Sequence, residues 1–294
     1  MGKAKAIEYR DRATGATVVE SVMGDRALRF AYETLLGRTL WCVLFGSRRI
    51  SARLGRRYDS PESKKDIAAL TSIPGCRWEE AAKEIDEYAS FNEFFTRRLK
   101  PGARPLGEGL VSPADGRLRL FLNADADSPF PLKGATRSLR TVFDGDAPAG
   151  RYDIVVVRLA PVDYHRFHFP FACTLSERVR VVPGKYHSVN PIALARHPDV
   201  YAENERQILK CHASFGDFWL VEVGAFGVGT IVQTFLGTRH VKGAEKGYFK
   251  FGGSTVILVV PAGRVTFDAD LVRNSSEDME TLVRCRERIG QVGG

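Results

Sequence analysis

The hydrophobic and polar positions divide the chain near Pro105 into a helical part and a β-rich part. After Pro105, short apolar runs alternate with turn residues, which is the pattern of an all-β region. Seven runs are predicted to be strands: Leu118–Leu122, Ile154–Leu159, Val179–Val182, Phe218–Val223, Thr230–Phe235, Thr255–Val260 and Val265–Phe267. From Met279 to Ile289 the apolar positions return at helical spacing and predict a short C-terminal helix. We therefore expect an α+β fold with a β-rich sandwich- or barrel-like core, in which residues 1–104 form a helical N-terminal region and residues 105–294 a β-rich domain.

The N-terminal part carries an arginine-rich segment at residues 26–57. Its apolar residues recur in steps of three and four, and it contains eight arginines but one acidic residue, Glu33. Trp41 and Phe45 lie on its apolar side. This makeup is typical of an amphipathic helix on a membrane surface, although a core-packed helix with a solvated arginine face explains the same pattern. Residues 1–24 are expected to form a loose arm or a short strand.

Short helices are expected between this segment and the β-rich part. The pattern predicts one at Ser63–Leu70 and one at Trp78–Tyr88. A third should begin at Ser90, because Ser90 and Glu93 have the spacing of a capping box. It should end at Pro101, because proline cannot continue a helix.

Composition limits the partners and the compartment. The formal charge of +8, from 43 Lys and Arg against 35 Asp and Glu, favours an anionic partner such as nucleic acid, acidic lipid or a phosphorylated substrate. The five cysteines have no Cys-x-x-Cys spacing, which argues against a disulfide framework or a zinc site and for a reducing compartment. No stretch approaches the roughly 20 apolar residues that span a bilayer, so we expect any membrane association to be peripheral.

Two glycines, Gly252 and Gly253, place Ser254 directly before a predicted strand. Glycine tolerates backbone angles that other residues avoid, so this pair can form a tight turn that holds the serine hydroxyl beside the Gly253 carbonyl. Intramolecular attack in such a geometry can reach an effective molarity on the order of 10⁵ M. An ordinary hairpin turn before a buried strand explains the same residues.

Three further residues could act with Ser254. Asp115 lies in a turn bounded by proline and glycine. His165 and His168 lie three residues apart, and this spacing predicts that both lie on one side of a helical turn. Histidine is the usual general base at neutral pH; two histidines could also bind a metal, but no third ligand motif accompanies them. Because a Ser/His/Asp site is recognised by its geometry, the sequence only nominates Asp115, His168 and Ser254.

At these residues the chain resembles the phosphatidylserine decarboxylases. The resemblance covers most of the chain from about Ser90 to the C-terminus and rests on five stretches in the same order: SFNEFFTRRLKPGARPL, SPADGR, APVDYHRFHFP, HSVNP and KGAEKGYFKFGGST. The last stretch contains one form of the family's Gly-Ser-Thr cleavage site. The basic N-terminus is similar to the shorter bacterial-type form, which lacks a membrane-spanning helix.

The resemblance implies that the chain is a proenzyme that cuts itself. His168, oriented by Asp115, would deprotonate Ser254, which would attack the Gly253 carbonyl and form an ester. β-Elimination would then break the chain after Gly253, and the new N-terminus would lose ammonia to become a covalent pyruvoyl group derived from Ser254. The resulting β and α fragments would stay together, because the strand after Ser254 belongs to the sheet.

The resemblance also implies the substrate and the place of work. The pyruvoyl group would form a Schiff base with phosphatidylserine, release CO2 and leave phosphatidylethanolamine, and His165 is our candidate for assisting decarboxylation or reprotonation. We expect a peripheral protein on the cytoplasmic side of the cell membrane, where residues 26–57 would meet the anionic phospholipid. No metal and no nucleic-acid partner are expected, and a homodimer is left open.

Three other readings are left open by the residues. A Ser/His/Asp hydrolase would keep its chain intact, but the sequence has no Gly-x-Ser-x-Gly elbow at Ser254. A non-catalytic relative would bind the lipid without releasing CO2. A pyruvoyl decarboxylase with another amine substrate would cleave itself in the same way, although the arginine-rich segment weighs against a soluble substrate.

Overall fold

The computed structural model describes residues 8–20, 55–128, 130–132, 135–184, 204–224, 231–251 and 254–293. Most of the arginine-rich segment, the HSVNP stretch, and Gly252 and Gly253 lie outside these ranges. The predicted membrane-surface helix and the turn before Ser254 therefore remain predictions. No helix in the described ranges is long and apolar enough to cross a membrane.

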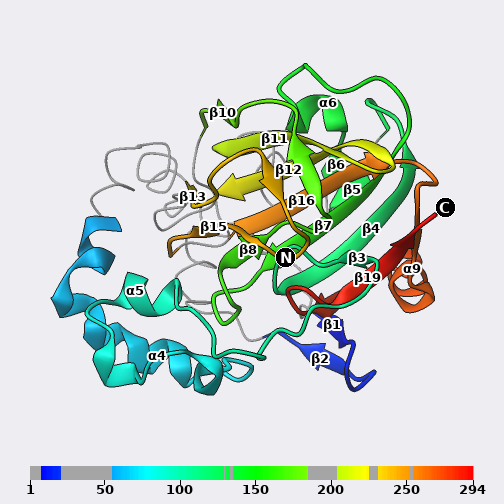
Figure 1. Ribbon diagram of the computed structural model, residues 1–294. Helices are drawn as coiled ribbons and strands as arrows, with labels where there is room; N and C mark the ends of the chain where they lie inside the picture. Colours follow the sequence, from blue (N-terminus) through cyan, green and yellow to red (C-terminus); the bar gives the residue numbers. More distant parts are fainter. Residues whose placement is uncertain are drawn as a thin grey trace, which may run out of the picture.

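One large sheet forms the centre of the structure (Figure 1). Within the described residues it has 11 strands in the order β14-β9-β11-β12-β16-β7-β4-β18-β1-β2, with β10 beside β11. Its long strands are β4 (Gly116–Ala124), β7 (Tyr152–Leu159), β11 (Arg206–Ala213), β12 (Gly216–Gly224) and β16 (Ser254–Pro261). Its short strands are β1 (Glu8–Asp11), β2 (Thr17–Val19), β9 (Cys173–Leu175), β10 (Arg180–Val182), β14 (Arg239–His240) and β18 (Glu280–Val283). The α+β fold with a β-rich core is confirmed.

Three small sheets accompany the large one. Their strands are β13 (Ile231–Gln233), β15 (Glu245–Phe249) and β8 (Arg166–His168) in the first, β17 (Val265–Phe267), β19 (Arg288–Val292) and β3 (Leu110–Val111) in the second, and β5 (Phe130–Leu132) and β6 (Ala135–Arg137) in the third. The first covers one face of the large sheet, because Phe167 of β8 and Phe249 of β15 belong to the same hydrophobic core as Val256 of β16. This layer contains His168 in β8, and His165 lies directly before that strand.

Both faces of β16 are buried, which explains its uninterrupted apolar sequence. Val256 and Leu258 pack beneath the small sheet of β8, β13 and β15. Ile257 and Val259 point to the opposite face and pack in a second core with α6 (Leu139–Val142). A strand that begins at Ser254 is therefore anchored on both sides and between two neighbouring strands.

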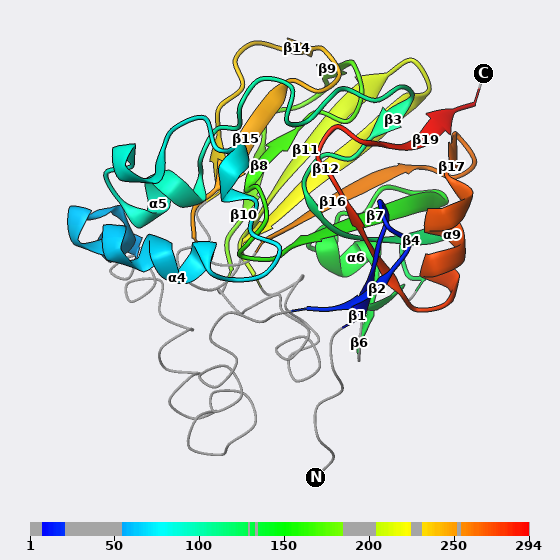
Figure 2. The ribbon, with the colours of Figure 1, turned by 90° about the horizontal axis from the view of Figure 1, so that it is seen from below.

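The helical elements before the sheet are short. They are η1 (Pro61–Asp66), α4 (Ile67–Thr71), η2 (Trp78–Glu80), η3 (Ile85–Glu87) and α5 (Phe91–Phe95). The Ser90 hydroxyl accepts a hydrogen bond from the Glu93 amide at 3.2 Å and caps α5, as the spacing predicts. The helix ends at Phe95, before Pro101, because the chain turns there to pack its phenylalanines in a separate core. In both ribbon views α4 and α5 lie at one end of the molecule and α9 (Ala269–Ser276) at the other (Figure 1 and Figure 2).

All seven predicted strands are confirmed, in β4, β7, β10, β12, β13, β16 and β17. The helix predicted for the last residues is wrong: β18 and β19 occupy this region, and α9 precedes them. Asp278 and Arg286 adopt positive φ angles of 61° and 68° on either side of β18, and these angles interrupt a helix. Pairing of β18 between β4 and β1 outweighs the helical spacing of its apolar residues.

The N-terminal region is not wholly helical. Residues 8–11 form β1, which pairs in parallel with β18, and β2 follows antiparallel to β1. The prediction of a short strand within residues 1–24 is therefore confirmed, and this arm is part of the large sheet. The large sheet therefore includes strands from both sides of the sequence change near Pro105.

Candidate active site

Ser254 is the first residue of β16 and lies between β7 and β12. Its backbone pairs with Leu159 on one side and with Gly224 on the other. Because side chains alternate along a strand, its hydroxyl lies on the same face as Val256, toward the small sheet of β8, β13 and β15. The serine is only 1% exposed, so a hydroxyl at this place is withheld from water.

Unpaired polar atoms gather where β16 begins. The Ser254 hydroxyl has no hydrogen-bond partner within the described part of the chain, and the same holds for Thr255 Oγ1 and His165 Nε2. Buried polar atoms are nearly always paired, and an unpaired one costs about 1–3 kcal/mol. A chain that leaves these atoms unpaired keeps them available for chemistry.

His165 is a neutral base with a free lone pair. Its ring is fully buried and lies 3.9 Å from the ring of Phe95. Nδ1 lies 3.0 Å from the carbonyl oxygen of Asp163, which can only accept, so Nδ1 carries the proton and Nε2 is unprotonated. Burial lowers the pKa of His165 to about 3, so the imidazole stays neutral at physiological pH.

His165 lies at the same end of the large sheet as Ser254. The ring of Phe95 contacts both His165 and, at 5.2 Å, Phe251, three residues before the serine. The loop that leads to His165 starts at Leu159, directly opposite Ser254. The spacing of the two histidines predicts one side of a helical turn, and this is wrong: His168 belongs to strand β8, and His165 lies just before it.

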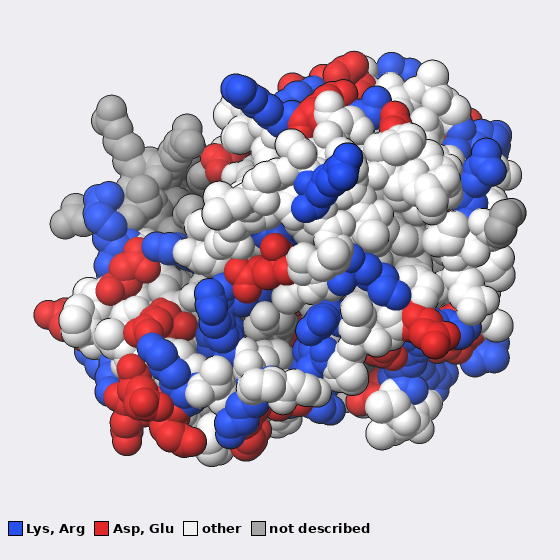
Figure 3. Space-filling model, in the orientation of Figure 1, with Lys and Arg blue, Asp and Glu red and all other residues white. Residues whose placement is uncertain are grey.

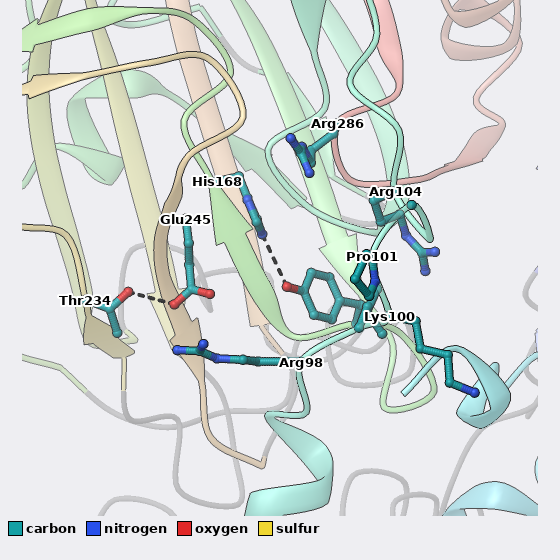
Figure 4. Close-up of a pocket in the computed structure, with 11 residues that line it drawn as sticks. Arg98, Lys100, Pro101, Arg104, His168, Thr234, Glu245 and Arg286 are labelled. Carbon is teal, nitrogen blue, oxygen red and sulfur yellow. Dashed lines mark hydrogen bonds between the residues drawn. The ribbon is translucent and has the colours of Figure 1, made fainter. Parts of the chain in front are cut away.

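His168 points away from the core that contains Val256. It follows Phe167, which is in that core, so alternation along β8 turns the His168 side chain to the other face. Nδ1 donates to the carbonyl of Gly243 at 3.0 Å, and Nε2 accepts from the Tyr164 hydroxyl at 3.3 Å (Figure 4). Burial lowers the pKa of His168 and raises that of Tyr164, so the imidazole is neutral and the phenol keeps its proton.

Asp115 is fully buried and ionised. Arg104 donates two hydrogen bonds to it, at 2.9 and 2.6 Å, and the Cys285 amide donates a third at 2.7 Å. Burial alone would raise the pKa of Asp115, but these bonds and the charges of Arg104 and Arg284 outweigh burial and lower it. The expected orienting bond from Asp115 to His168 is not among the contacts of the described residues, where Gly243 orients the histidine.

Asp115, directly before β4, and Ser254, the first residue of β16, nevertheless lie at the same end of the large sheet. Arg117 of β4 pairs with Arg158 of β7, and Leu159 of β7 pairs with Ser254. Two strand spacings, or roughly 10 Å, therefore separate the two backbones. The His168 amide donates to the carbonyl of Pro113, in the turn before Asp115, at 2.7 Å. The four predicted residues thus surround one end of the sheet without direct hydrogen bonds to one another, and their roles in self-cleavage stay predictions.

A buried ion pair crosses the space between the two layers. Lys246 of β15 and Glu222 of β12 are both fully buried, with Nζ 2.8 Å from Glu222 Oε2. Gln233 binds both of them, at 3.0 Å each. Glu222 lies opposite Val256, so it is on the same face as Ser254 and two positions along. Sequence reasoning missed this pair, because its partners lie 24 residues apart and have no recognisable spacing.

A cavity of about 520 Å³ opens beside His168 (Figure 4). It is lined by Arg98, Leu99, Lys100, Pro101, Gly102, Arg104, Tyr164, His168, Thr234, Glu245 and Arg286. Ser254 does not line it, and no group of three or more His, Cys, Asp or Glu in the described ranges is placed to hold a metal ion. Sequence reasoning missed Arg98, Arg286 and Tyr164 as cavity residues, although each lies in or near a motif or a predicted element.

Comparison with protein families gives one match for most of the β-rich part. Residues 91–291 match the family described as phosphatidylserine decarboxylase. This range contains Asp115, both histidines and Ser254, and it also contains every strand from β3 to β18.

Individual relatives match over nearly the whole chain. A protein from Ruminiclostridium cellulolyticum, named phosphatidylserine decarboxylase proenzyme, is 39% identical over 97% of this chain and 97% of its own length. Proteins of the same name from Clostridium perfringens and Chlamydia trachomatis are 39% and 38% identical, over 97% and 98% of this chain and 99% and 98% of their own lengths. The similarity therefore includes the N-terminal region as well as the sheet.

Proposed function

Because the chain belongs to the phosphatidylserine decarboxylase family, we propose that it is a proenzyme that cleaves itself between Gly253 and Ser254. The mature enzyme would then convert phosphatidylserine to phosphatidylethanolamine and CO2. The observation that carries this proposal is the Ser254 hydroxyl, which is buried, has no partner among the described residues and stands at the first position of a strand anchored on both sides.

Self-cleavage needs only the serine, the preceding peptide and a base. The base takes the Ser254 hydroxyl proton, Oγ attacks the Gly253 carbonyl carbon, and the amide nitrogen gains a proton as the C–N bond breaks. Loss of the Ser254 Cα proton then breaks the Cβ–Oγ bond and leaves a carboxylate on Gly253 and dehydroalanine on the other fragment. Tautomerisation to an imine and addition of water release ammonia and leave a pyruvoyl group.

The residues around Ser254 fit such a group. It would take the place of Ser254 at the start of β16, joined by an amide to Thr255, in a strand that β7 and β12 hold in place. Within the described residues, the unpaired Nε2 of His165 lies at the same end of the sheet. A pyruvoyl ketone supplies an acceptor for the substrate amine and a sink for the electrons that decarboxylation leaves behind, the role that pyridoxal phosphate has in other enzymes.

We assign His165 to the decarboxylation stage. The free lone pair on Nε2 can take the proton that the substrate ammonium gives up when its nitrogen attacks the ketone, and the imidazolium so formed is a strong acid, because burial lowers the pKa of His165 to about 3. Such a group can return a proton to the substrate carbon after CO2 has left. Phe95 packs against the ring at a tilt of 36°.

We retain His168, with Asp115, as the pair proposed for self-cleavage. His168 is tied to the Gly243 carbonyl, 11 residues before the scissile serine, and its amide is tied to the turn that holds Asp115. For His168 to take the Ser254 proton, its Nε2 must exchange the Tyr164 hydroxyl for the serine. The proposal therefore includes a rearrangement of this histidine during cleavage.

Peripheral binding to an anionic membrane also belongs to the proposal. Its support is the net charge of +8 and the arginine-rich segment at residues 26–57. Each basic residue near an anionic leaflet contributes about 1 kcal/mol. Recruitment to phosphatidylserine vesicles at low salt tests it, and equal sedimentation with and without vesicles would contradict it.

Denaturing electrophoresis together with CO2 release tests the function itself. We expect two fragments, and more than one molecule of CO2 released from phosphatidylserine per enzyme molecule. A single full-length band with esterase activity would favour the Ser/His/Asp hydrolase. Two fragments without activity on phosphatidylserine would favour a pyruvoyl decarboxylase of another amine.

A further inference from the structure

The cavity beside His168 contains more positive charge than its neighbours neutralise. Four of its lining residues are cations, Arg98, Lys100, Arg104 and Arg286, and Glu245 is the acid among the described residues that line it. Arg104 is paired with Asp115 and Glu80, and Glu245 is paired with Arg166. After these pairs are removed, three cations remain and no acid.

Arg286 is held toward this cavity by its backbone. It adopts a positive φ of 68°, which costs a non-glycine residue about 1–3 kcal/mol. Its amide donates to the carbonyl of Ser112 at 2.9 Å, and its carbonyl accepts from the Gly107 amide at 2.9 Å. Strain of this kind, fixed by hydrogen bonds on both sides, is typical of positions where a side chain must point in one direction.

One buried nitrogen of the Arg286 guanidinium also lacks a partner among the described residues. This nitrogen is Nε. The guanidinium packs over Gly243, where an added Cβ would lie 2.9 Å from Nε. A buried N–H of a cation without an acceptor is costly, and a bound anion would remove this cost.

Arg98 faces the same space from the other wall. It follows α5, and the close-up shows Arg286 at one side of the cavity and Arg98 at the other, with His168 and Glu245 between them (Figure 4). In the space-filling view, Lys and Arg side chains lie on several sides of the centre of this face (Figure 3). Two guanidiniums on opposite walls can bind an anion with several acceptor oxygens, as phosphate groups have.

We propose that this cavity is an anion site, which binds a phosphate group through Arg98 and Arg286. Ser254 is absent from its lining, and His168 faces it from the side of β8 opposite to Phe167. The phosphate could belong to a lipid headgroup or be free in solution. In either case it would bind beside the Gly243 carbonyl that orients His168.

Titration calorimetry on the full-length chain tests this site. The Ser254→Ala variant serves as background, so that neither cleavage nor turnover changes the protein during titration. Inorganic phosphate and soluble dihexanoyl phosphatidylglycerol are the two probes, at constant ionic strength set with chloride. Tighter binding of the lipid assigns the site to a phosphodiester headgroup, and tighter binding of phosphate assigns it to the free ion.

Matched variants distinguish anion binding in this cavity from the general attraction of anions to a basic protein. Arg98→Gln and Arg286→Gln should each weaken the tighter probe about tenfold or more, the effect of losing a hydrogen bond to a charged group. Arg264→Gln removes the same charge from an exposed position outside the cavity and should leave binding unchanged. If neither probe binds, or if all three variants lose the same affinity, the proposal is overturned. Arg98 is exposed, so its replacement tests the site even where Arg286→Gln disturbs folding.

Discussion

The imidazole of His165 donates its Nδ1 proton to the carbonyl of Asp163 at 3.0 Å, which leaves Nε2 as a buried base with no partner among the described residues. Asp163 is itself anchored, because its carboxylate accepts from Arg117 and from the Ala160 amide. The loop between β7 and β8 therefore fixes both the tautomer and the position of this histidine. His168, three residues later, has its Nε2 engaged by Tyr164. The two histidines of one motif are thus prepared for different tasks.

Replacing His165 should separate the two stages of the proposed function. In His165→Gln we expect two fragments on denaturing gels, as in the unchanged chain, but a loss of CO2 release of about 10²-fold or more, the usual contribution of a general acid or base. His212→Gln is the matched control, because His212 is exposed and lies on β11, away from this loop. Loss of cleavage together with loss of turnover would show that His165 is not confined to decarboxylation.

The buried histidines should make stability depend on pH. Burial lowers the pKa of His165 to about 3 in the folded chain, whereas an unfolded histidine titrates near about 6.5. The unfolded chain therefore binds more protons as the pH falls, and the folded state loses stability. For one such histidine the loss is about 2 kcal/mol between about pH 7 and pH 5, and the lowered pKa of His168 adds to it in the same direction.

Urea unfolding of the uncleaved Ser254→Ala variant at the two pH values measures this loss. Adding His165→Gln should reduce the pH dependence, because the contribution of that residue is removed. An unchanged difference between the two pH values would contradict the burial-induced shift.

The ion pair of Glu222 and Lys246 should be costly to break from one side. Glu222→Gln leaves a fully buried ammonium without its charged partner, and removal of one member of a buried pair destabilises a protein by about 3–5 kcal/mol. The double variant Glu222→Gln, Lys246→Met removes both charges and should recover most of the stability. Chemical denaturation of the single and double variants measures the difference, and a double variant that is less stable than Glu222→Gln would contradict this account.

A side chain at Gly243 should be costly, because of its backbone conformation and its neighbours together. It has a φ of 76°, and an added Cβ would lie 2.7 Å from Leu106 Cδ1 and 2.9 Å from Arg286 Nε. Gly237 has a φ of 79° but nothing within 4 Å, so Gly237→Ala carries only the backbone penalty of about 1 kcal/mol. We expect Gly243→Ala to lower the melting temperature more than Gly237→Ala and to slow self-cleavage, because its carbonyl orients His168. Equal melting temperatures and equal rates of cleavage would show that the contacts of Gly243 are unimportant.

The sequence predicts best where a strand is buried on both faces. The pattern predicts strands at Thr255–Val260 and Ile154–Leu159 because nearly all of their residues are apolar. Both strands lie in the centre of the sheet. The helix prediction for Met279–Ile289 is wrong, because β18 takes its conformation from pairing between β4 and β1. The local spacing of apolar residues does not indicate those partner strands. The same limit applies to His168, whose strand conformation comes from pairing of β8 with β15.

In the candidate site, too, the sequence indicates what depends on neighbouring residues and misses contacts between residues far apart in the chain. Ser254 is recognisable from the glycines before it, and its burial follows from the strand after it. The partners of Asp115 were not predictable, because Arg104 and the Cys285 amide reach it from opposite ends of the β-rich region. Arg286 takes its direction from a positive φ angle and from Ser112, neither of which a local pattern indicates.

Intact mass spectrometry of the purified chain tests the central claim, that Ser254 cuts the backbone before it and becomes the reactive group. The account predicts two masses: residues 1–253, and residues 254–294 lighter by one ammonia than a fragment with an N-terminal serine. Ser254→Ala should give one full-length mass. A single full-length mass for the unchanged chain, or a C-terminal fragment that retains its serine nitrogen in an active preparation, would contradict the account.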